Sequence, residues 1–511
     1  MNFKNQLKIF TGTALSAMAF TGLARQSLAG ETHYRQLSNL PFVQNRPTAQ
    51  TAQTLTDELF FQRATQVYLW ALPLVNTLGM QVGSEKAFGS GYNILPIWKD
   101  RLNAKTLVTT PNSDVIYAMN YVDLGKDGPL VVEAPPNMQG ILLDYWQRPI
   151  PVDGGKFAGD VGFAGPDGGK GGKFLLLPPS YKGKVPQGYY VYRSGTNSVF
   201  IFLRGFYNDP ANLKPAVALL EQTKIYPLNG QAKPMQFPNA SNIPVNMLPI
   251  NNGSAFDQLK RLVDREDNHL ADPDWLGMLA LIGIIKGQPF NPDAHTREIL
   301  DSAAKTGYKM SRVIGFQDVL KDNSLKIYAD RHWINPLDNI TPPGAGKTLN
   351  LSWTNVAGGY RDLDARIWFF TNYYAVSPGM ISKVPGKGAA YMISFTDSQG
   401  KPLVGANSYI LHLPSNIPAA NFWSVTLYEG ANASGLENGQ SFPSLGSRNK
   451  PKQNPDGSTD IYFGTNAPKG KQSNWMATPK DKGYFAILRL YGPTQNYLDK
   501  SWKPDDIKQV K

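Results

Sequence analysis

Cysteine does not occur in this sequence of 511 residues. Its absence excludes disulfide bonds, thiolate metal sites, a cysteine nucleophile and the attachment of a lipid to cysteine. A chain of this length can bury a large apolar core and so does not need covalent cross-links to fold. We therefore expect packing alone to hold the fold together.

Histidine is scarce, and the five histidines lie far apart in the sequence. Neither an H-E-x-x-H metal motif nor a G-x-S-x-G nucleophile elbow occurs. The sequence gives no reason to expect a metal site, and we predict no cofactor.

Basic residues exceed acidic ones but form no arginine-rich run. The formal net charge is +12, and Lys4, Lys8 and Arg25 contribute +3 of it within the first 29 residues, so the rest of the chain carries 51 − 3 − 39 = +9. This excess is modest for so long a chain, and no nucleic-acid-binding motif accompanies it. We expect no nucleic-acid partner.

The amino terminus has the three-part pattern of a secretory signal peptide. Lys4 and Lys8 precede an apolar stretch from Ile9 to Leu23, and the segment ends in Ser-Leu-Ala at Ala29. A membrane anchor is the alternative, but threonine and serine interrupt the stretch, which is short for a membrane span. We expect cleavage after Ala29, which would leave a periplasmic or secreted protein without an integral membrane segment.

The stretch TPPGAGKTLNL, residues 341–351, ends like a P-loop but does not begin like one. The signature G-x-x-x-x-G-K-[ST] requires a glycine five residues before Gly346, where this chain has Thr341. The residues that follow are poor helix formers, whereas a P-loop opens into a helix. We interpret the stretch as a surface loop, because an exported protein would also lack a supply of ATP.

The hydrophobic periodicity predicts two β-rich regions separated by helices. A helix is expected at 55–82, and short period-two runs rich in Val, Ile and Tyr follow it. A glycine-rich stretch at 153–183 interrupts these runs and is predicted to be a long loop. Helical patterns return at 210–225 and 254–320, and further strand-like runs follow residue 331.

These patterns predict a mainly β fold with helical additions, in which two β-sandwich-like domains are joined by a helical segment. The expected parts are a poorly ordered segment at 30–53, a first β-rich domain at 54–225, a helical linking segment at 226–330 and a second β-domain at 331–511. In the second domain, the run FWSVTLYE alternates apolar and polar residues, which predicts a strand with one buried side.

Polar and aromatic residues gather at the ends of two predicted strands. They are Asn112, Asp114 and Tyr117 at the first strand, and Asp144, Trp146 and Arg148 at the second. A carboxylate beside Tyr, Trp or Arg can act as a general acid or base whose pKa its neighbours set. The same residues can equally form an Asx-turn and a buried Arg–Asp pair that hold the strands in register.

Several motifs together resemble the paired DUF1254 and DUF1214 domains of bacterial envelope and secreted proteins: TPNSDVIY, GPDGGKGGKFLLLPPSYKG, MLALIGIIKGQPFNPD, GANSYILHLPSNIPAANFWSVTLYE, NPDGSTDIYFG, NWMATP and FAILRLYGP. The family element T-P-N-x-D-T-x-Y falls on Thr110, Pro111, Asn112, Asp114 and Tyr117. Val115 stands where many members have threonine. The resemblance implies two β-sandwich-like domains, the second of jelly-roll type, and a homo-oligomer, but no particular reaction.

Two functions are open at this point. The first, which we favour, is binding of a small-molecule or carbohydrate-like ligand by Asn112, Asp144, Trp146, Arg148 and Arg489. A buried and paired Arg489 would be structural, whereas one that faces a ligand would anchor an anion.

The second function is a nucleotide-independent envelope enzyme of hydrolase type. In this alternative Asp114 is the general acid or base and Tyr117 supports it, while Trp146 or Trp423 forms a wall for a ring of the substrate. A tryptophan on an alternating strand is more often part of the core, so Trp423 also has a structural interpretation.

Overall fold

The structure is a computed structural model that describes residues 32–154, 158–267, 270–321, 323–335, 337, 354–355 and 359–510. The predicted signal peptide and the P-loop-like stretch lie outside these residues. The chain divides into two compact units, residues 1–62 and residues 63–511, and each is described by itself.

The described part of the first unit contains a hairpin and the start of a helix. Its elements are β1 (Phe42–Val43), β2 (Arg46–Pro47) and α2 (Ala49–Trp70), which continues into the second unit. Thr48 caps α2, because its side-chain oxygen accepts a hydrogen bond from the amide of Thr51 at 3.1 Å. The segment 30–53, for which we expected poor order, thus has regular structure where it is described.

The predicted helix at 55–82 is two helices, α2 and α3 (Leu72–Phe88). Pro73 lies in the first turn of α3, and proline cannot continue a helix because it lacks an amide donor and its ring clashes with the carbonyl four residues earlier. The chain therefore breaks at Ala71, where the sequence pattern predicted continuity.

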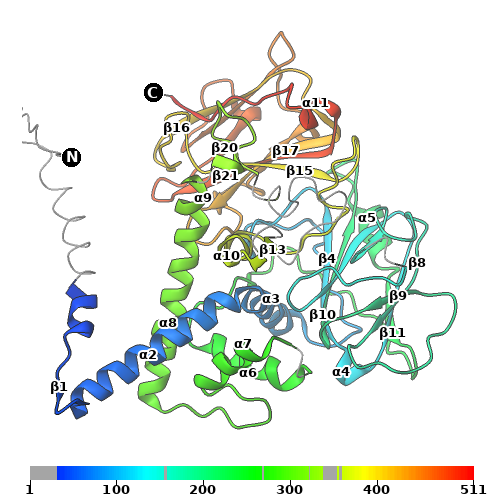
Figure 1. Ribbon diagram of the computed structural model, residues 1–511. Coiled ribbons are helices and arrows are strands. Elements are labelled where there is room, and N and C mark those ends of the chain that lie inside the picture. Colours follow the sequence, from blue (N-terminus) through cyan, green and yellow to red (C-terminus); the bar gives the residue numbers. More distant parts are fainter. Residues whose placement is uncertain are drawn as a thin grey trace, which may run out of the picture. The chain divides into compact units, whose positions relative to one another are not determined.

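The first β-rich domain consists of two four-stranded sheets that share one core (Figure 1). The first sheet has the order β4 (Ile116–Asp123), β10 (Ser198–Gly205), β6 (Gln139–Asp144) and β7 (Asp160–Gly162). The second has the order β11 (Lys224–Pro227), β5 (Leu130–Ala134), β8 (Gly172–Leu177) and β9 (Tyr190–Arg193). Alternate residues of both sheets, such as Ile201 and Leu176, are fully buried in the shared core.

Strands β7 and β8 correct the prediction of a long loop at 153–183. The glycine-rich turn between them is closed by Asp167, whose carboxylate accepts hydrogen bonds from the amides of Gly162 at 2.8 Å and Gly171 at 3.1 Å. Glycine is disfavoured in strands. The many glycines around β7 and β8 therefore hid the alternating pattern of these strands.

The second β-rich domain repeats this two-sheet arrangement. One sheet has the order β15 (Ala389–Ser394), β21 (Tyr484–Pro493), β17 (Ala419–Glu429) and β18 (Ser444–Gly446). The other has the order β20 (Trp475–Ala477), β19 (Thr459–Gly464), β16 (Ser408–Leu413) and β22 (Lys508–Val510). Trp423, Val425 and Leu427 of β17 point into the core between these sheets, so Trp423 is a core residue.

Helices lie between the domains in sequence, as predicted. The main ones are α6 (Ser254–Arg265), α7 (Pro273–Leu281), α8 (Ala294–Val313), which runs into a π-helix (Ile314–Asp318), and α10 (Leu363–Asn372). The shorter elements are β3 (Thr106–Leu107), β12 (Val245–Asn246), β13 (Thr354–Asn355), β14 (Tyr360–Arg361), α4 (Leu124–Asp127), α5 (Lys214–Leu220), α9 (Val319–Lys321) and α11 (Gln495–Leu498), with 3₁₀ turns at Asn323–Leu325, Ser447–Asn449 and Gln472–Asn474.

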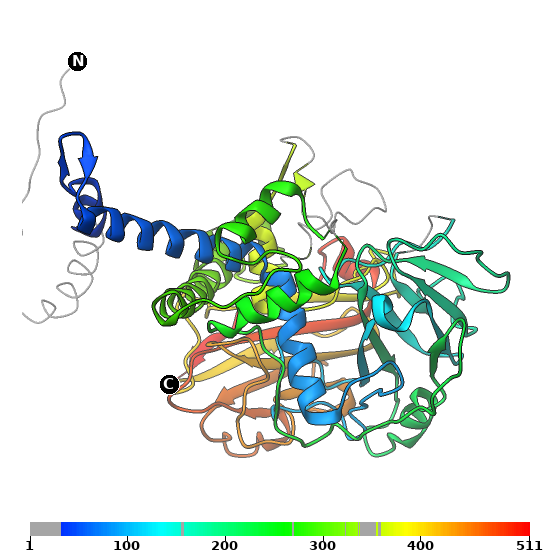
Figure 2. The same ribbon diagram turned by 90° about the horizontal axis from the view of Figure 1, so that it is seen from below.

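Both β domains also bury the outer face of one sheet. On the sheet that contains β4 and β10, Met119, Phe200 and Phe202 pack against Met80 of α3 and against Tyr374, which follows α10. Figure 2 shows α3 running between the two domains. The prediction that the strand FWSVTLYE has one buried side is therefore incomplete, because its polar side is buried as well.

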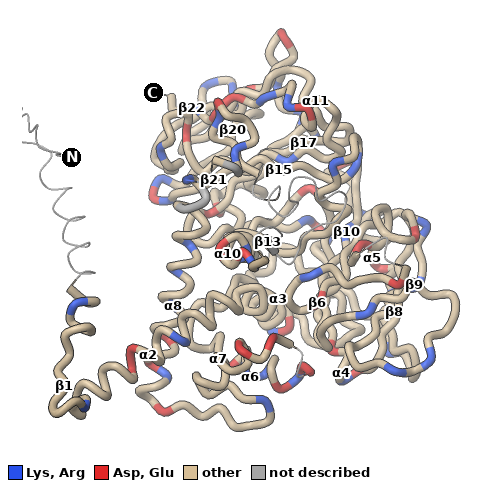
Figure 3. The backbone as a smooth tube through the Cα atoms, in the orientation of Figure 1, with Lys and Arg blue, Asp and Glu red and all other residues tan. Residues whose placement is uncertain are grey.

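Charged residues are interspersed along the described chain rather than gathered on one element (Figure 3). Among the described residues, no helix is both long and apolar enough to cross a membrane.

Candidate functional site

The outer face of the sheet β15-β21-β17 carries polar side chains where it meets the first domain. Ser424 and Thr426 of β17 and Arg489 of β21 are each at most 2% exposed. Buried polar groups require partners. Ser424 and Arg489 have theirs in the segment Thr110–Asp114 of the first domain, whereas Thr426 pairs with Ser444 of β18 at 3.0 Å. We call this surface the interdomain face.

The segment Thr110–Asp114 is held in a turn that the sequence encodes locally. The side-chain oxygen of Asn112 accepts a hydrogen bond from the amide of Asp114 at 2.7 Å, which is the predicted Asx-turn. Thr110 has a positive φ of 38°, and its amide donates to the carbonyl of Ala433 at 2.6 Å. Its hydroxyl donates to the carbonyl of Asn372 at 2.7 Å, so the turn contacts two distant segments.

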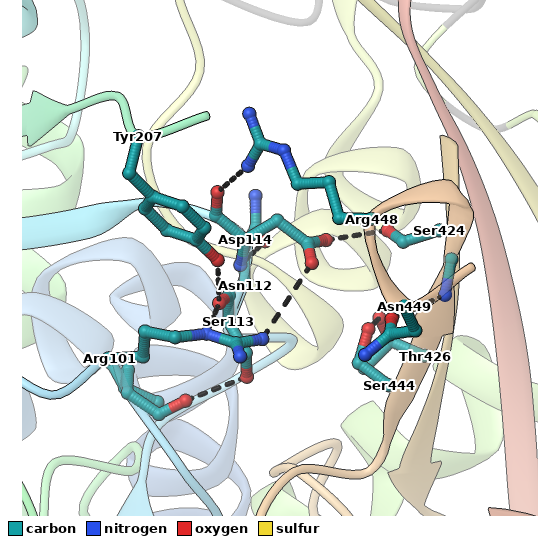
Figure 4. A network of polar contacts seen from close by, with 12 residues as sticks. Arg101, Asn112, Ser113, Asp114, Tyr207, Ser424, Thr426, Ser444, Arg448 and Asn449 are labelled. Carbon is teal, nitrogen blue, oxygen red and sulfur yellow. Dashed lines mark hydrogen bonds and ion pairs between the residues drawn. The ribbon is translucent and has the colours of Figure 1, made fainter. Parts of the chain in front are cut away.

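Asp114 lies at the centre of a polar network between the domains (Figure 4). One carboxylate oxygen accepts a hydrogen bond from the Ser424 hydroxyl at 2.6 Å, and the other lies 4.0 Å from the guanidinium of Arg101. The side chain is buried. Both carboxylate oxygens of Asp114 therefore have protein partners.

Two arginines frame Asp114. Arg448 donates to its backbone carbonyl at 2.7 Å and lies over the ring of Phe422 at 3.5 Å. Arg101 donates to the carbonyl of Ser113 and lies over the ring of Phe442 at 3.8 Å. These contacts bind the turn to both domains, and neither arginine was identified from the sequence.

Arg489 lies on the interdomain face close to the same turn. It donates to the hydroxyl of Tyr428 and to the carbonyl of Thr110 at 3.2 Å, while the Tyr428 hydroxyl donates to the carbonyl of Pro111 at 2.7 Å. No carboxylate among the described residues lies within ion-pairing distance of Arg489. Its partners are neutral oxygens, so its positive charge is buried without a compensating anion.

Tyr117 lies on β4, three residues after Asp114, and is separate from the Asp114 network. Burial raises the pKa of its hydroxyl, so the phenol stays protonated at neutral pH. The hydroxyl of Tyr117 makes no hydrogen bond to Asp114 or to any other described residue. The ring packs on Phe202 at 4.9 Å between centroids.

Asp144, Trp146 and Arg148 form a second group, at the turn after β6. Arg148 pairs with Asp144 at 2.7 Å, and the amide of Arg148 donates to the other oxygen of the same carboxylate at 2.9 Å. Burial raises the pKa of Asp144, while Arg148 acts to lower it. The pair closes a tight turn within one segment, and the Arg148 side chain is 44% exposed, so it is not a fully buried pair between two strands.

Trp146 is held within the first domain and its adjoining helical segments. Its indole donates to the carbonyl of Leu270 at 3.0 Å and packs edge-on against Trp70. No hydrogen bond, ion pair or ring contact among the described residues connects this second group to Asp114. Of the predicted ligand-binding residues, Asn112 and Arg489 lie near the same turn. Asp144, Trp146 and Arg148 form the second group, away from that turn.

Sequence reasoning missed several residues that build the interdomain face. Tyr491 accepts a hydrogen bond from the side-chain amide of Asn112 and stacks on Phe422 at 3.9 Å. The polar side of FWSVTLYE was a usable signal for Ser424, because polar residues on a central strand need a partner. Among the described residues, no group of three or more His, Asp or Glu side chains is arranged to hold a metal ion.

Comparison with protein families defines the class of both β domains. Residues 92–227 match the model of DUF1254, and residues 388–495 match that of DUF1214, each described as a protein of unknown function. The chain therefore contains the two domains that its motifs predicted. The turn with Asp114 belongs to the first and Arg489 to the second.

The solved structures similar to this chain include the following two. The VPA0106 protein from Vibrio parahaemolyticus is 20% identical, with a TM-score of 0.49 over 88% of this chain and 100% of that one. An uncharacterized protein from Burkholderia cenocepacia is 12% identical, with a TM-score of 0.40 over 96% of this chain and 99% of that one. Comparison with curated proteins gives no match.

Proposed function

We propose that this is an exported binding protein whose small-molecule ligand lies on the interdomain face. One observation carries the proposal: the hydroxyls of Tyr117, Tyr374 and Tyr391 have no hydrogen-bond partner among the described residues, although each tyrosine is at most 7% exposed. None of the three oxygens is among the fully buried atoms without a partner, so each keeps some accessible surface that a ligand could contact. A polar group in a largely buried position favours a partner, and where the protein supplies none, a ligand or water can supply it.

The surroundings of these hydroxyls suit a small ligand that has rings and polar groups. Tyrosine rings provide apolar area, and their hydroxyls provide hydrogen bonds at fixed positions. A carbohydrate-like molecule offers both a flat apolar face and many hydroxyls. The backbone beside Tyr374 is held in place, because the amide of Ala375 donates a hydrogen bond to the side-chain oxygen of Gln147 at 2.8 Å.

The alternative is an envelope hydrolase in which Asp114 is the general acid or base. Such a group must reach the proton that it transfers. The carboxylate of Asp114 is already engaged by Ser424 and Arg101, so the geometry favours a structural role for Asp114 and a binding role for the face.

Native mass spectrometry of the chain purified from the exported fraction, beside a denaturing spectrum of the same sample, tests the proposal. We expect an excess mass that disappears on denaturation, and a mature chain that begins after Ala29. An oligomer mass with nothing bound would contradict ligand binding and favour an assembly role. A chain that retains residues 1–29 in the cytoplasmic fraction would contradict export.

A further inference from the structure

We propose that the interdomain face binds an oxyanion group of its ligand, a carboxylate or a phosphate, between Arg204 of the first domain and Arg489 of the second. This inference rests on the proposed binding function and specifies the chemical class of the ligand.

Each β domain contributes one cross-strand pair of arginine and tyrosine to this site. Arg204 of β10 lies opposite Tyr117 of β4, and Arg489 of β21 lies opposite Tyr391 of β15. The guanidinium carbons lie 5.9 Å and 5.8 Å from the centroids of the respective rings. All four residues belong to the sheet faces turned away from the two sandwich cores, because their strand neighbours in sequence point into those cores.

Neither arginine has an anionic partner among the described residues. The Nε of Arg204 is buried without a hydrogen-bond partner, and its Nη2 reaches only the thioether sulfur of Met380, at 3.4 Å. A thioether is a weak acceptor, so the Nε and Nη2 donors of Arg204 have no strong acceptor among the described residues. The guanidinium of Arg489 is buried and that of Arg204 is half-buried, and a carboxylate or phosphate would give either of them two parallel hydrogen bonds.

Asp160 is the acidic residue whose pKa the charge of Arg204 lowers, but it does not neutralise this arginine. Its two oxygens accept hydrogen bonds from the Ser377 hydroxyl at 2.6 Å and from the amide of Gly379 at 2.8 Å. No ion pair joins Asp160 to Arg204 among the described residues.

Three tyrosines connect the two arginines. Met380, which contacts Arg204, accepts a hydrogen bond from the amide of Ala389 at 2.9 Å, and Ala389 begins the strand that carries Tyr391 opposite Arg489. The charges of both arginines also act on the hydroxyls of Tyr117, Tyr374 and Tyr391. Burial raises the pKa of each phenol, so each remains an O–H donor at neutral pH. Two cations and three unpartnered O–H donors form a set that suits an oxyanion and offers nothing to a cation.

Isothermal titration calorimetry with inorganic phosphate and with succinate, in a chloride buffer of constant ionic strength, tests this inference. We expect the wild-type protein to bind one of the two anions, and the one bound identifies the oxyanion. Arg204→Gln should weaken binding by roughly tenfold or more, and Tyr391→Phe by roughly three- to tenfold. Tyr391→Phe and Tyr117→Phe keep their rings, so they test the hydroxyls even if Arg204→Gln impairs folding.

Tyr484→Phe is the matched control. Tyr484 lies on β21, the strand of Arg489, and its hydroxyl is buried without a partner, but it points into the core of the second domain. We expect this variant to bind the anion as the wild type does. Equal weakening in Tyr484→Phe and Tyr391→Phe, or none in either, would place the anion elsewhere and overturn the inference.

Failure of the anion site and failure of the binding function give different results. If the wild type binds neither anion while native mass spectrometry shows a neutral bound molecule, the oxyanion inference is wrong and the binding function stands. If neither method detects a ligand, both are wrong.

Discussion

Asp114 connects residues that are far apart in the chain. Its carboxylate accepts from Ser424 and its backbone carbonyl from Arg448, both of which belong to the second β domain. A buried carboxylate is stable only if its partners are in place. We therefore expect Asp114 to hold the two domains together.

Replacement of Asp114 by Asn tests this role. The amide cannot accept the Ser424 hydrogen bond and attract Arg101 as the carboxylate does, and it leaves Arg101 with a buried, uncompensated charge. We expect a loss of about 2–4 kcal/mol in the free energy of unfolding, measured by chemical denaturation. Unchanged stability with loss of a turnover would instead support the acid–base role.

Asp153→Asn is the control for this substitution. Asp153 pairs with Arg193 at 3.0 Å, but both side chains are about half exposed. Exposed ion pairs contribute little, so we expect a change below about 1 kcal/mol. A similar loss in both variants would show that burial of Asp114 does not account for its effect.

The sequence indicated part of this residue-level picture. Asn112 and Asp114 could be identified because an Asx-turn depends on residues two positions apart. Arg101 and Arg448 could not, since isolated arginines between polar residues look solvated, and only the tertiary fold brings them to the turn. The same holds for Ala375 and Gln147, whose hydrogen bond depends on a fold that joins distant segments.

At the scale of elements, α3 packs with its backbone directly against another chain segment. A Cβ atom at Gly79 would lie 2.0 Å from the carbonyl oxygen of Leu248, and one at Gly83 would lie 2.0 Å from that of Asn246. Real Cβ atoms do not approach so closely. The two glycines, one helical turn apart, therefore allow α3 to reach the segment that contains β12.

Gly79→Ala and Gly83→Ala should each destabilise the protein despite the higher helix propensity of alanine. The added methyl group must displace backbone atoms rather than a flexible side chain. We expect a loss of about 1–3 kcal/mol in the free energy of unfolding for each variant.

Gly277→Ala in α7 is the comparison, because nothing lies within 4 Å of the added atom. There we expect a gain of about 0.5–1 kcal/mol from helix propensity. Thermal or chemical unfolding of the three variants measures both the expected loss and the expected gain in stability. A gain in stability from alanine at Gly79 or Gly83 would show that α3 does not pack as closely against the segment of β12 as described.

Strands with a clear alternating pattern were predicted well, and glycine-rich strands were not. The runs that form β4, β10, β17 and β21 are rich in branched and aromatic residues, so their type was evident. β7 and β8 were missed because neighbouring glycines have no side chain to show a period of two. The jelly-roll connectivity and the homo-oligomer remain predictions.

At the scale of the whole molecule, Asp160 links the first β domain to the segment that leads into the second. It lies at the start of β7, and its hydrogen bonds to Ser377 and Gly379 cross between the domains. Burial raises the pKa of Asp160 to about 6, although Ser377 and Gly379 act to lower it. The folded protein therefore holds this proton more tightly than the unfolded chain does.

This difference predicts how stability depends on pH. Between the ordinary pKa of 3.8 and the folded pKa of about 6, the native state binds more protons, so the free energy of unfolding falls as pH rises through this window. We expect Asp160 to account for a decrease on the order of 2–3 kcal/mol. Urea denaturation of the wild type and of Asp160→Asn at several pH values should show this decrease only in the wild type.

Ser377→Ala provides the companion test. Removal of the hydroxyl takes away a donor that favours the ionised carboxylate, so the pKa of Asp160 should rise further. The decrease in stability should then extend to higher pH. If stability falls over the same pH range in Ser377→Ala as in the wild type, the Ser377 contact does not set the pKa of Asp160.

The position of β21 constrains how the protein can form during synthesis. It follows both β15 and β17 in the sequence, yet it pairs with β15 on one side and with β17 on the other. Until it leaves the ribosome, β15 and β17 have no common neighbour, and their apolar faces and open edges are exposed to other chains. A chain that contains β15 and β17 but not yet β21 is therefore incomplete, and it is most prone to aggregate until β21 takes its place between them.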